Sequence, residues 1–127
     1  MDIQTHQQIN EDLCGTPVML SPGFCRIELK TSDAMKVDDH GLVHGGFIFG
    51  LADYAAMLAV NDPNVVLAGA TVKFLKLVKT GESVTAEAET TSNQGKKQGV
   101  SVSVYRGEES VFSGEFTCFV LDRHVLG

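Results

Sequence analysis

The chain has 127 residues, 43% of them hydrophobic, and a formal net charge of −6 at pH 7. This length and composition suit one domain with a hydrophobic core and exclude a disordered chain, while the acidic balance disfavours a general nucleic-acid-binding protein. The first residues are polar, and neither a signal peptide nor a membrane-spanning run is present. We therefore expect a cytoplasmic protein, without a membrane partner, that forms a single domain over residues 1–127.

The three cysteines are widely spaced and odd in number, which argues against a disulfide framework or a zinc site. Two of them lie in apolar strand patterns, so reduced core thiols are the expected state; the three are Cys14, Cys25 and Cys118. His40, His44 and Asp39 have a spacing that a metal could use, but a polar loop explains them more simply. We predict no metal site.

The first part of the chain is predicted to contain one strand and a polar loop. Residues 1–20, with no clear period over the first ten, are expected to form an N-terminal arm or a short helix. Pro22-Gly23 marks a turn. Residues 24–31 alternate between apolar and charged side chains, which predicts a half-buried strand. Residues 38–43 are mostly polar and are expected to form a loop.

The most distinctive segment is residues 47–60, which are apolar except for Gly50 and Asp53. A helix that is apolar all round is either a membrane span or a buried core helix, and a span needs about 20 residues. A core helix that starts at a Gly-Gly turn is therefore predicted. Its end is expected at residues 61–64, where Pro63 blocks continuation. A carboxylate in such a helix is costly unless it is paired or used, which singles out Asp53.

Four strands are predicted after the helix. They cover residues 65–78, in two pieces (65–68 and 70–78) with a bulge or bend near Leu75-Lys76, and then residues 83–91, 100–105 and 111–121. Short turns at residues 80–82, 93–96 and 106–109 make neighbouring strands antiparallel. Alternation in the later strands means that one sheet face is buried, and the long helix must cover it. The sequence thus predicts an α+β fold, an antiparallel sheet wrapped around a central helix.

The order of these elements, with His44-Gly45-Gly46 followed by Asp53 nine residues after the histidine, resembles the hotdog fold. More narrowly, it resembles the PaaI-like acyl-CoA thioesterases. The resemblance implies that Asp53 is a general base or nucleophile and that the Gly45 N–H polarises the thioester oxygen. It also implies active sites at a homodimer interface, in a dimer or a dimer of dimers, with Asp53 facing the oxyanion site of the other subunit. CoA would enter only as part of the ligand, without any cofactor.

Physical reasoning supports these roles. A helix N-terminus offers free N–H groups and a partial positive charge, which suit an oxygen that gains negative charge. Asp53 lies about two turns further along, too far to serve the same carbonyl, so pairing across two subunits is favoured. His44 is expected to position the turn rather than to transfer protons. Expected substrate-binding residues, which include basic side chains for the nucleotide, are Gly46, Thr71, Lys73, Lys96 and Lys97.

Two positions depart from the family pattern. Six residues before the histidine, many relatives carry an asparagine that helps to position the thioester or water; here this catalytic candidate is Asp38. An acid there is expected to raise a pKa in the site and to repel a carboxylate product. No accessory Ser or Thr is obvious, and Thr71 is the nearest hydroxyl. The alternative is a non-catalytic acyl-CoA-binding module, as in FapR-like repressors. The motifs of hotdog hydratases and dehydratases are absent.

Overall fold

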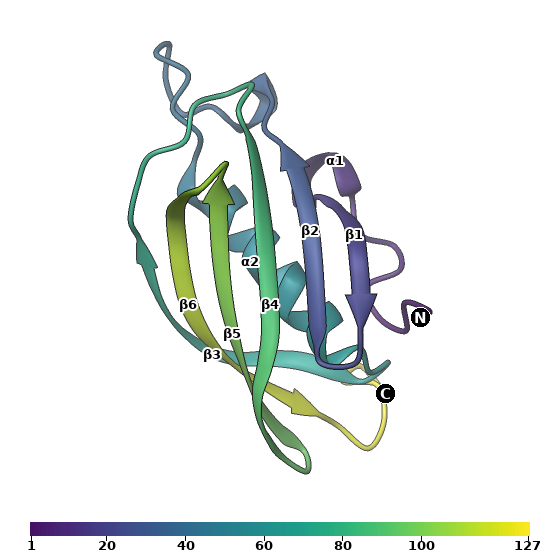
Figure 1. Ribbon diagram of the computed structural model, residues 1–127. Coiled ribbons are helices and arrows are strands. Elements are labelled where there is room, and N and C mark those ends of the chain that lie inside the picture. The colour runs from purple at the N-terminus through teal and green to yellow at the C-terminus, as the bar shows by residue number, and fades with distance from the viewer.

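The computed structural model describes residues 1–127 and shows a six-stranded antiparallel sheet curved around one long helix (Figure 1). The strands lie in the order β1-β2-β4-β5-β6-β3. The predicted hotdog fold is confirmed. The elements in chain order are α1 (Glu11–Cys14), β1 (Thr16–Ser21), β2 (Phe24–Lys30), a 3-10 turn (Asp33–Met35), α2 (Gly45–Val60), β3 (Val65–Phe74), β4 (Ser83–Gln94), β5 (Lys97–Arg106) and β6 (Glu109–Val120).

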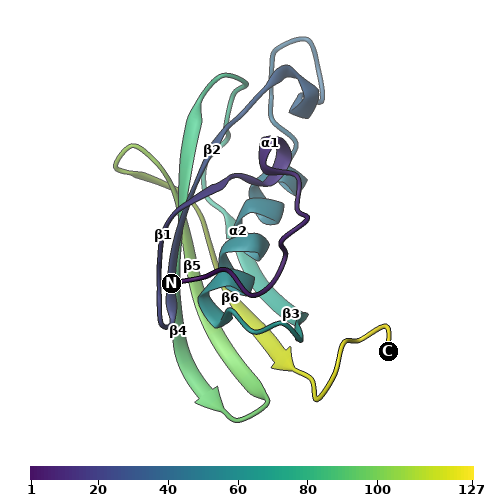
Figure 2. The ribbon, with the colours of Figure 1, turned by 90° about the vertical axis from the view of Figure 1, so that its right-hand side faces the viewer.

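Helix α2 is the core helix that the apolar segment predicts. His44 caps its N-terminus, and Asn61 closes its C-terminus in the left-handed conformation with φ 53°. Most of its residues are buried, because the concave face of the sheet surrounds one side of the helix (Figure 2). No helix in the chain is long and apolar enough to span a membrane.

The concave face of the sheet is built from small and medium apolar side chains at every second position. Side chains alternate across a strand, so these residues point to α2 while their neighbours point away. Valine and alanine in β4 and β5 let the helix approach closely, and larger rings in β6 fill the space beside it. The set comprises Val84, Ala86, Ala88, Val100, Val102, Val104, Phe112 and Phe116, all essentially buried.

Two sequence predictions about the strands are wrong in detail. The structure adds a sixth strand, β1 (Thr16–Ser21), where only an arm or short helix was predicted. Strand β3 stops at Phe74 and does not extend to residue 78. The bulge or bend predicted near Leu75-Lys76 is present as a bend at Lys76, just past the end of this strand, and a further irregularity lies between Leu67 and Gly69.

The two edges of the sheet differ. Strand β1 carries Pro17, and its register with β2 shifts between Pro17 and Met19, so Val18 has no partner there. Strand β3 pairs with β6 without interruption from Gly69 to Phe74 and has no neighbour on its other side. Residues 1–10 run along the side of α2 away from the sheet (Figure 2), and Asn61 fixes them by bonding to the backbones of Asp2 and Gln4.

Candidate active site

The start of α2 presents a set of backbone donors. Gly45, the first helical residue, has an N–H without an intrahelical acceptor. The Nδ1 atom of His44 accepts a hydrogen bond from the Gly46 N–H at 3.2 Å, which is the positioning contact expected of this histidine. The phenyl ring of Phe74 lies against Gly45, where an added Cβ would be 3.1 Å from the ring. Glycine at position 45 therefore lets the Phe74 ring pack against the helix start.

An apolar pocket of about 280 Å³ opens beside this helix start. Three of the side chains around it are strongly exposed in the single chain, namely Leu77 (75%), Phe74 (56%) and Val37 (54%). Exposed apolar side chains around a pocket are typical of a surface that contacts a ligand or a partner. The lining residues are Val37, Leu42, Val43, His44, Gly45, Ile48, Phe74, Lys76, Leu77 and Val78.

Asp53 lies two turns along α2, and its carboxyl group is mostly buried. Its Oδ1 atom is buried without a hydrogen-bond partner. Burial raises the pKa of Asp53 from 3.8 to about 6. Burial raises the pKa values of the Cys14 and Cys118 thiols, and the charge of Asp53 raises them further. A carboxylate with a free oxygen and a raised pKa is a candidate general base.

Within the single chain, the side chain of Asp38 shapes its own loop. Its Oδ1 atom accepts hydrogen bonds from the N–H groups of His40 at 2.9 Å and Leu42 at 3.2 Å. The raised pKa of Asp53 in the same chain results from burial. The expected effect of Asp38 on a site shared between two subunits stays a prediction.

Four expected substrate-binding residues lie away from the helix start in the single chain. Thr71 and Lys73 are paired with Glu115 and Ser113, on the sheet face opposite to α2. Lys96 forms an ion pair with Asp122 at 2.8 Å, and Lys97 begins β5 beside it. The hydrogen bond from the Val120 N–H to the Lys96 carbonyl places both at the end of the sheet where α2 ends. Gly46, by contrast, is at the helix start.

Sequence reasoning missed several residues of the pocket. Lys76 is the lysine that lines it, and Val37 and Leu77 come from two different loops. A cluster of basic residues was visible in the sequence, but nothing in it indicated which lysine would face the helix start. No group of three or more His, Cys, Asp or Glu side chains could hold a metal ion.

Comparison with known proteins places these features in a family. Residues 40–113 match the family model described as the thioesterase superfamily. An uncharacterised protein from Pyrococcus horikoshii has a crystal structure with 52% sequence identity and a TM-score of 0.99, covering 100% of this chain and 98% of that one. A sigma28-regulated virulence protein from Campylobacter jejuni is 28% identical with a TM-score of 0.94 over 97% and 95% of the two chains.

A mutant of the phenylacetic acid degradation protein PaaI from Thermus thermophilus is 27% identical, with a TM-score of 0.80 over 87% and 96% of the chains. Among curated relatives, methylthioribose-1-phosphate isomerase from Aquifex aeolicus is 56% identical over 96% of this chain. Transcription factor FapR from Bacillus subtilis is 35% identical over 61% of it. The chain spans only 27% and 43%, respectively, of these two relatives.

Proposed function

The chain belongs to the thioesterase superfamily, and from this premise we propose that it hydrolyses an acyl-CoA thioester. The observation that carries the proposal is the carboxyl group of Asp53, which has a buried, unpartnered oxygen and a pKa raised to about 6. Such a group is mostly ionised at neutral pH, yet it is basic enough to accept a proton from water. The isomerase activity named for the Aquifex relative is not proposed, because this chain corresponds to only 27% of that protein.

In the proposed reaction, Asp53 accepts a proton from water as the water oxygen attacks the thioester carbonyl carbon. The carbonyl oxygen gains negative charge and accepts hydrogen bonds at the start of α2, where the Gly45 N–H is available. The C–S bond then breaks, CoA leaves as the thiol after taking up the proton that Asp53 accepted from water, and the acyl group leaves as a carboxylic acid. One backbone donor of this kind is commonly worth about 100–1,000-fold in rate.

We propose that the site is completed by a second copy of the chain. Asp53 is two turns from its own helix start, so one carbonyl carbon cannot lie next to both. Gly50 lies on the same helix, and a Cβ added there would meet nothing within 4 Å. Glycine costs about 1 kcal/mol relative to alanine inside a helix, and the packing of this chain does not require it. Close approach of a second helix would account for it, and the free β3 edge offers a strand for pairing.

The ligand is proposed to enter with its apolar part in the pocket beside Gly45 and its CoA phosphates near basic side chains. Lys76 lines this pocket. Lys36 and Lys79 belong to the neighbouring loops, which are joined to residues 42–43 by β-bridges. In a dimer, lysines that are remote in one chain could still reach the ligand of the other, so Lys73, Lys96 and Lys97 stay candidates.

The test is steady-state hydrolysis of acyl-CoA esters of several chain lengths by the wild type and by Asp53→Asn. We expect the substitution to lower kcat/KM by about 100-fold or more, because a general base contributes on the order of 100–10,000-fold. The wild-type kcat/KM should fall as the pH is lowered through about 6, where Asp53 becomes protonated. Asp39→Asn removes an exposed acid from the loop before α2 and serves as the control. Hydrolysis that survives Asp53→Asn would refute this mechanism.

A second candidate function is acyl-CoA binding without turnover. It is favoured by the FapR proteins among the relatives and by Asp38, a carboxylate where thioesterases of this type often have an amide. Binding of acyl-CoA with a micromolar dissociation constant, together with no hydrolysis by the wild type at any chain length, would favour this alternative. Turnover by the wild type would exclude it.

A further inference from the structure

Residues 75–78 follow β3, and we name them the strap; its last three residues, Lys76, Leu77 and Val78, form one wall of the pocket beside the helix start. Both ends of the strap are held by backbone hydrogen bonds. The N–H groups of Leu75 and Lys76 bond to the Val111 carbonyl at 2.8 and 3.2 Å, and the Val78 carbonyl accepts from the Val43 N–H at 2.9 Å. Between these anchors lies Leu77, whose side chain is 75% exposed and lines the pocket.

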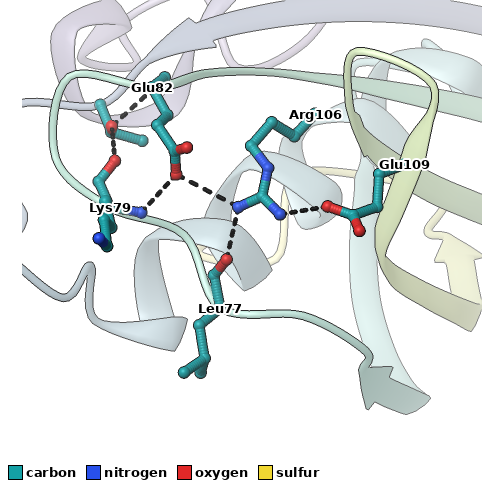
Figure 3. Close-up of polar contacts among 6 residues, drawn as sticks. Leu77, Lys79, Glu82, Arg106 and Glu109 are labelled. Atoms are coloured by element: carbon teal, nitrogen blue, oxygen red, sulfur yellow. Dashed lines mark hydrogen bonds and ion pairs between the residues drawn. The ribbon is translucent and has the colours of Figure 1, made fainter.

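One side chain holds the middle of the strap. The Nη1 atom of Arg106, at the end of β5, donates to the Leu77 carbonyl oxygen at 2.6 Å (Figure 3). It is the only side chain that bonds to the strap backbone. The same nitrogen lies 3.2 Å from Glu82 Oε1, and Nη2 pairs with Glu109. Glu82 Oε1 also accepts from the Lys79 N–H at 2.7 Å, which fixes the turn that follows the strap.

The arrangement is specific to a guanidinium group. Arginine presents several N–H donors in a planar fork, so it can bond to a carbonyl and two carboxylates at once. A lysine ammonium is a compact point charge, and beside two carboxylates it would be drawn towards them and away from the neutral carbonyl. The contacts to Glu82 and Glu109 hold the guanidinium in place, and the bond to Leu77 transfers that fixed position to the pocket wall.

We propose that Arg106 is a positioning residue, which holds Leu77 in the wall of the pocket and thereby sets how well the site accepts an apolar acyl chain. The proposal rests on the proposed function, since it takes the acyl part of the thioester as the occupant of this pocket. A cavity of about 280 Å³ suits an acyl chain and is too small for a whole CoA ester. Arg106 reaches the strap backbone only and is not proposed to contact the reacting atoms.

The proposal predicts a dependence on chain length that a general loss of stability would not produce. A short acyl group such as acetyl does not need the pocket, whereas an octanoyl group fills it. We therefore expect Arg106→Lys and Arg106→Met to weaken octanoyl-CoA binding by about three- to tenfold, because binding must then order the released strap around Leu77, and acetyl-CoA binding by less than about twofold. Leu77→Ser, at an exposed position, should give the same selective loss.

The experiment measures acetyl-CoA and octanoyl-CoA binding by titration calorimetry in full-length protein carrying Asp53→Asn, so that hydrolysis does not consume the ligand. Glu108→Gln is the matched control, because it neutralises an exposed acid in the turn after β5, whereas the ion pairs of Arg106 are with Glu82 and Glu109. Arg106→Lys keeps the positive charge and is the deciding variant if Arg106→Met folds poorly. In the Asp53-intact protein, Arg106→Lys should raise KM for octanoyl-CoA with little change in kcat.

Equal weakening of both ligands would overturn the proposal, as would an effect of Glu108→Gln as large and as selective as that of Arg106→Lys. An unchanged octanoyl-CoA affinity in the Arg106 variants would also overturn it. These results are separate from the proposed function: a wild type without turnover would refute hydrolysis, while the binding series would still decide the role of Arg106.

Discussion

At the scale of one residue, Asp53 shows that a group of the candidate site can lower the stability of the fold. Its carboxyl group is buried on an apolar helix, and one oxygen has no partner. Ionising such a group disfavours folding, which is why its pKa is raised to about 6. The same shift brings the group towards the pKa of an effective base at neutral pH. Burial of this carboxyl group therefore favours its use as a base, by raising its pKa, and at the same time lowers the stability of the folded protein.

The first prediction concerns the free energy of unfolding of Asp53→Asn. The folded-state pKa of about 6 exceeds the ordinary 3.8, so the wild type loses stability as the pH rises through this range. At about 1.4 kcal/mol for each pH unit, the loss is on the order of 2–3 kcal/mol. Urea denaturation should find Asp53→Asn more stable than the wild type by this order at pH 7.5, with a much smaller gain at pH 4. A pH-independent difference would contradict the assignment.

At the scale of elements, two turns of the chain require glycine for different reasons. Gly15 joins α1 to β1 with a φ of +101°, and an added Cβ would lie 2.7 Å from Ile27 Cγ2 and 2.9 Å from the Glu28 carbonyl oxygen. Gly81 lies in the turn before β4 with a φ of +90°, but a Cβ there would meet nothing within 4 Å. The first position combines backbone strain with a clash, and the second has strain alone.

The second prediction uses this pair. Gly81→Ala should lower the free energy of unfolding by about 1 kcal/mol, the cost of holding a side chain at positive φ. Gly15→Ala should cost about 2 kcal/mol more, because the buried wall formed by Ile27 and the backbone of Glu28 must also move. Chemical denaturation of both variants under the same conditions measures the difference. Equal losses would mean that the clash is relieved without cost.

The sequence predicted α2 and the later strands well because their patterns are local. An apolar run bounded by Gly45-Gly46 and Pro63 defines a core helix by itself, and period-two alternation defines β4 to β6. Strand β1 escaped prediction because residues 16–21 contain a proline and no clean alternation, as suits an edge strand. Only pairing with β2 makes it a strand, and that pairing is a property of the tertiary structure.

The sequence drew attention to part of the candidate site. Asp53, His44 and Gly45 stood out because one acid in an apolar helix and a glycine pair at its start are unusual, and their roles stay predictions. The pocket wall was not, because Val37, Leu77 and Arg106 come from three segments that only the fold brings together. The face of β3 on which Thr71 and Lys73 lie depended on a bulge at residues 67–69, which shifts the alternation seen in the sequence.

At the scale of the whole molecule, the third prediction tests the proposed dimer. Gly50→Leu places a bulky side chain where nothing in this chain lies within 4 Å of an added Cβ, so the isolated fold should tolerate it. In a dimer packed closely at this glycine, the added side chain should separate the subunits and abolish hydrolysis.

Light scattering after size-exclusion chromatography measures the mass, and circular dichroism checks the fold. Ala34→Leu adds the same side chain at an exposed position in the 3-10 turn (Asp33–Met35) and should leave a wild-type dimer intact. A wild type that elutes as a monomer, or a Gly50→Leu variant with unchanged mass and activity, would contradict the proposed interface.

The two edges of the sheet differ in how readily they can pair with a further strand, and this difference affects aggregation. An exposed, regular edge strand is a template for further strands, and repeated addition at both edges would build an open fibril. Here Pro17 and the unpaired Val18 interrupt the β1 edge, whereas only β3 keeps a regular edge. Two sheets joined at β3 would each present only the interrupted edge to solvent. Growth along the sheet would then stop after one association step. A chain with a single regular edge strand would in this way form dimers and not fibrils.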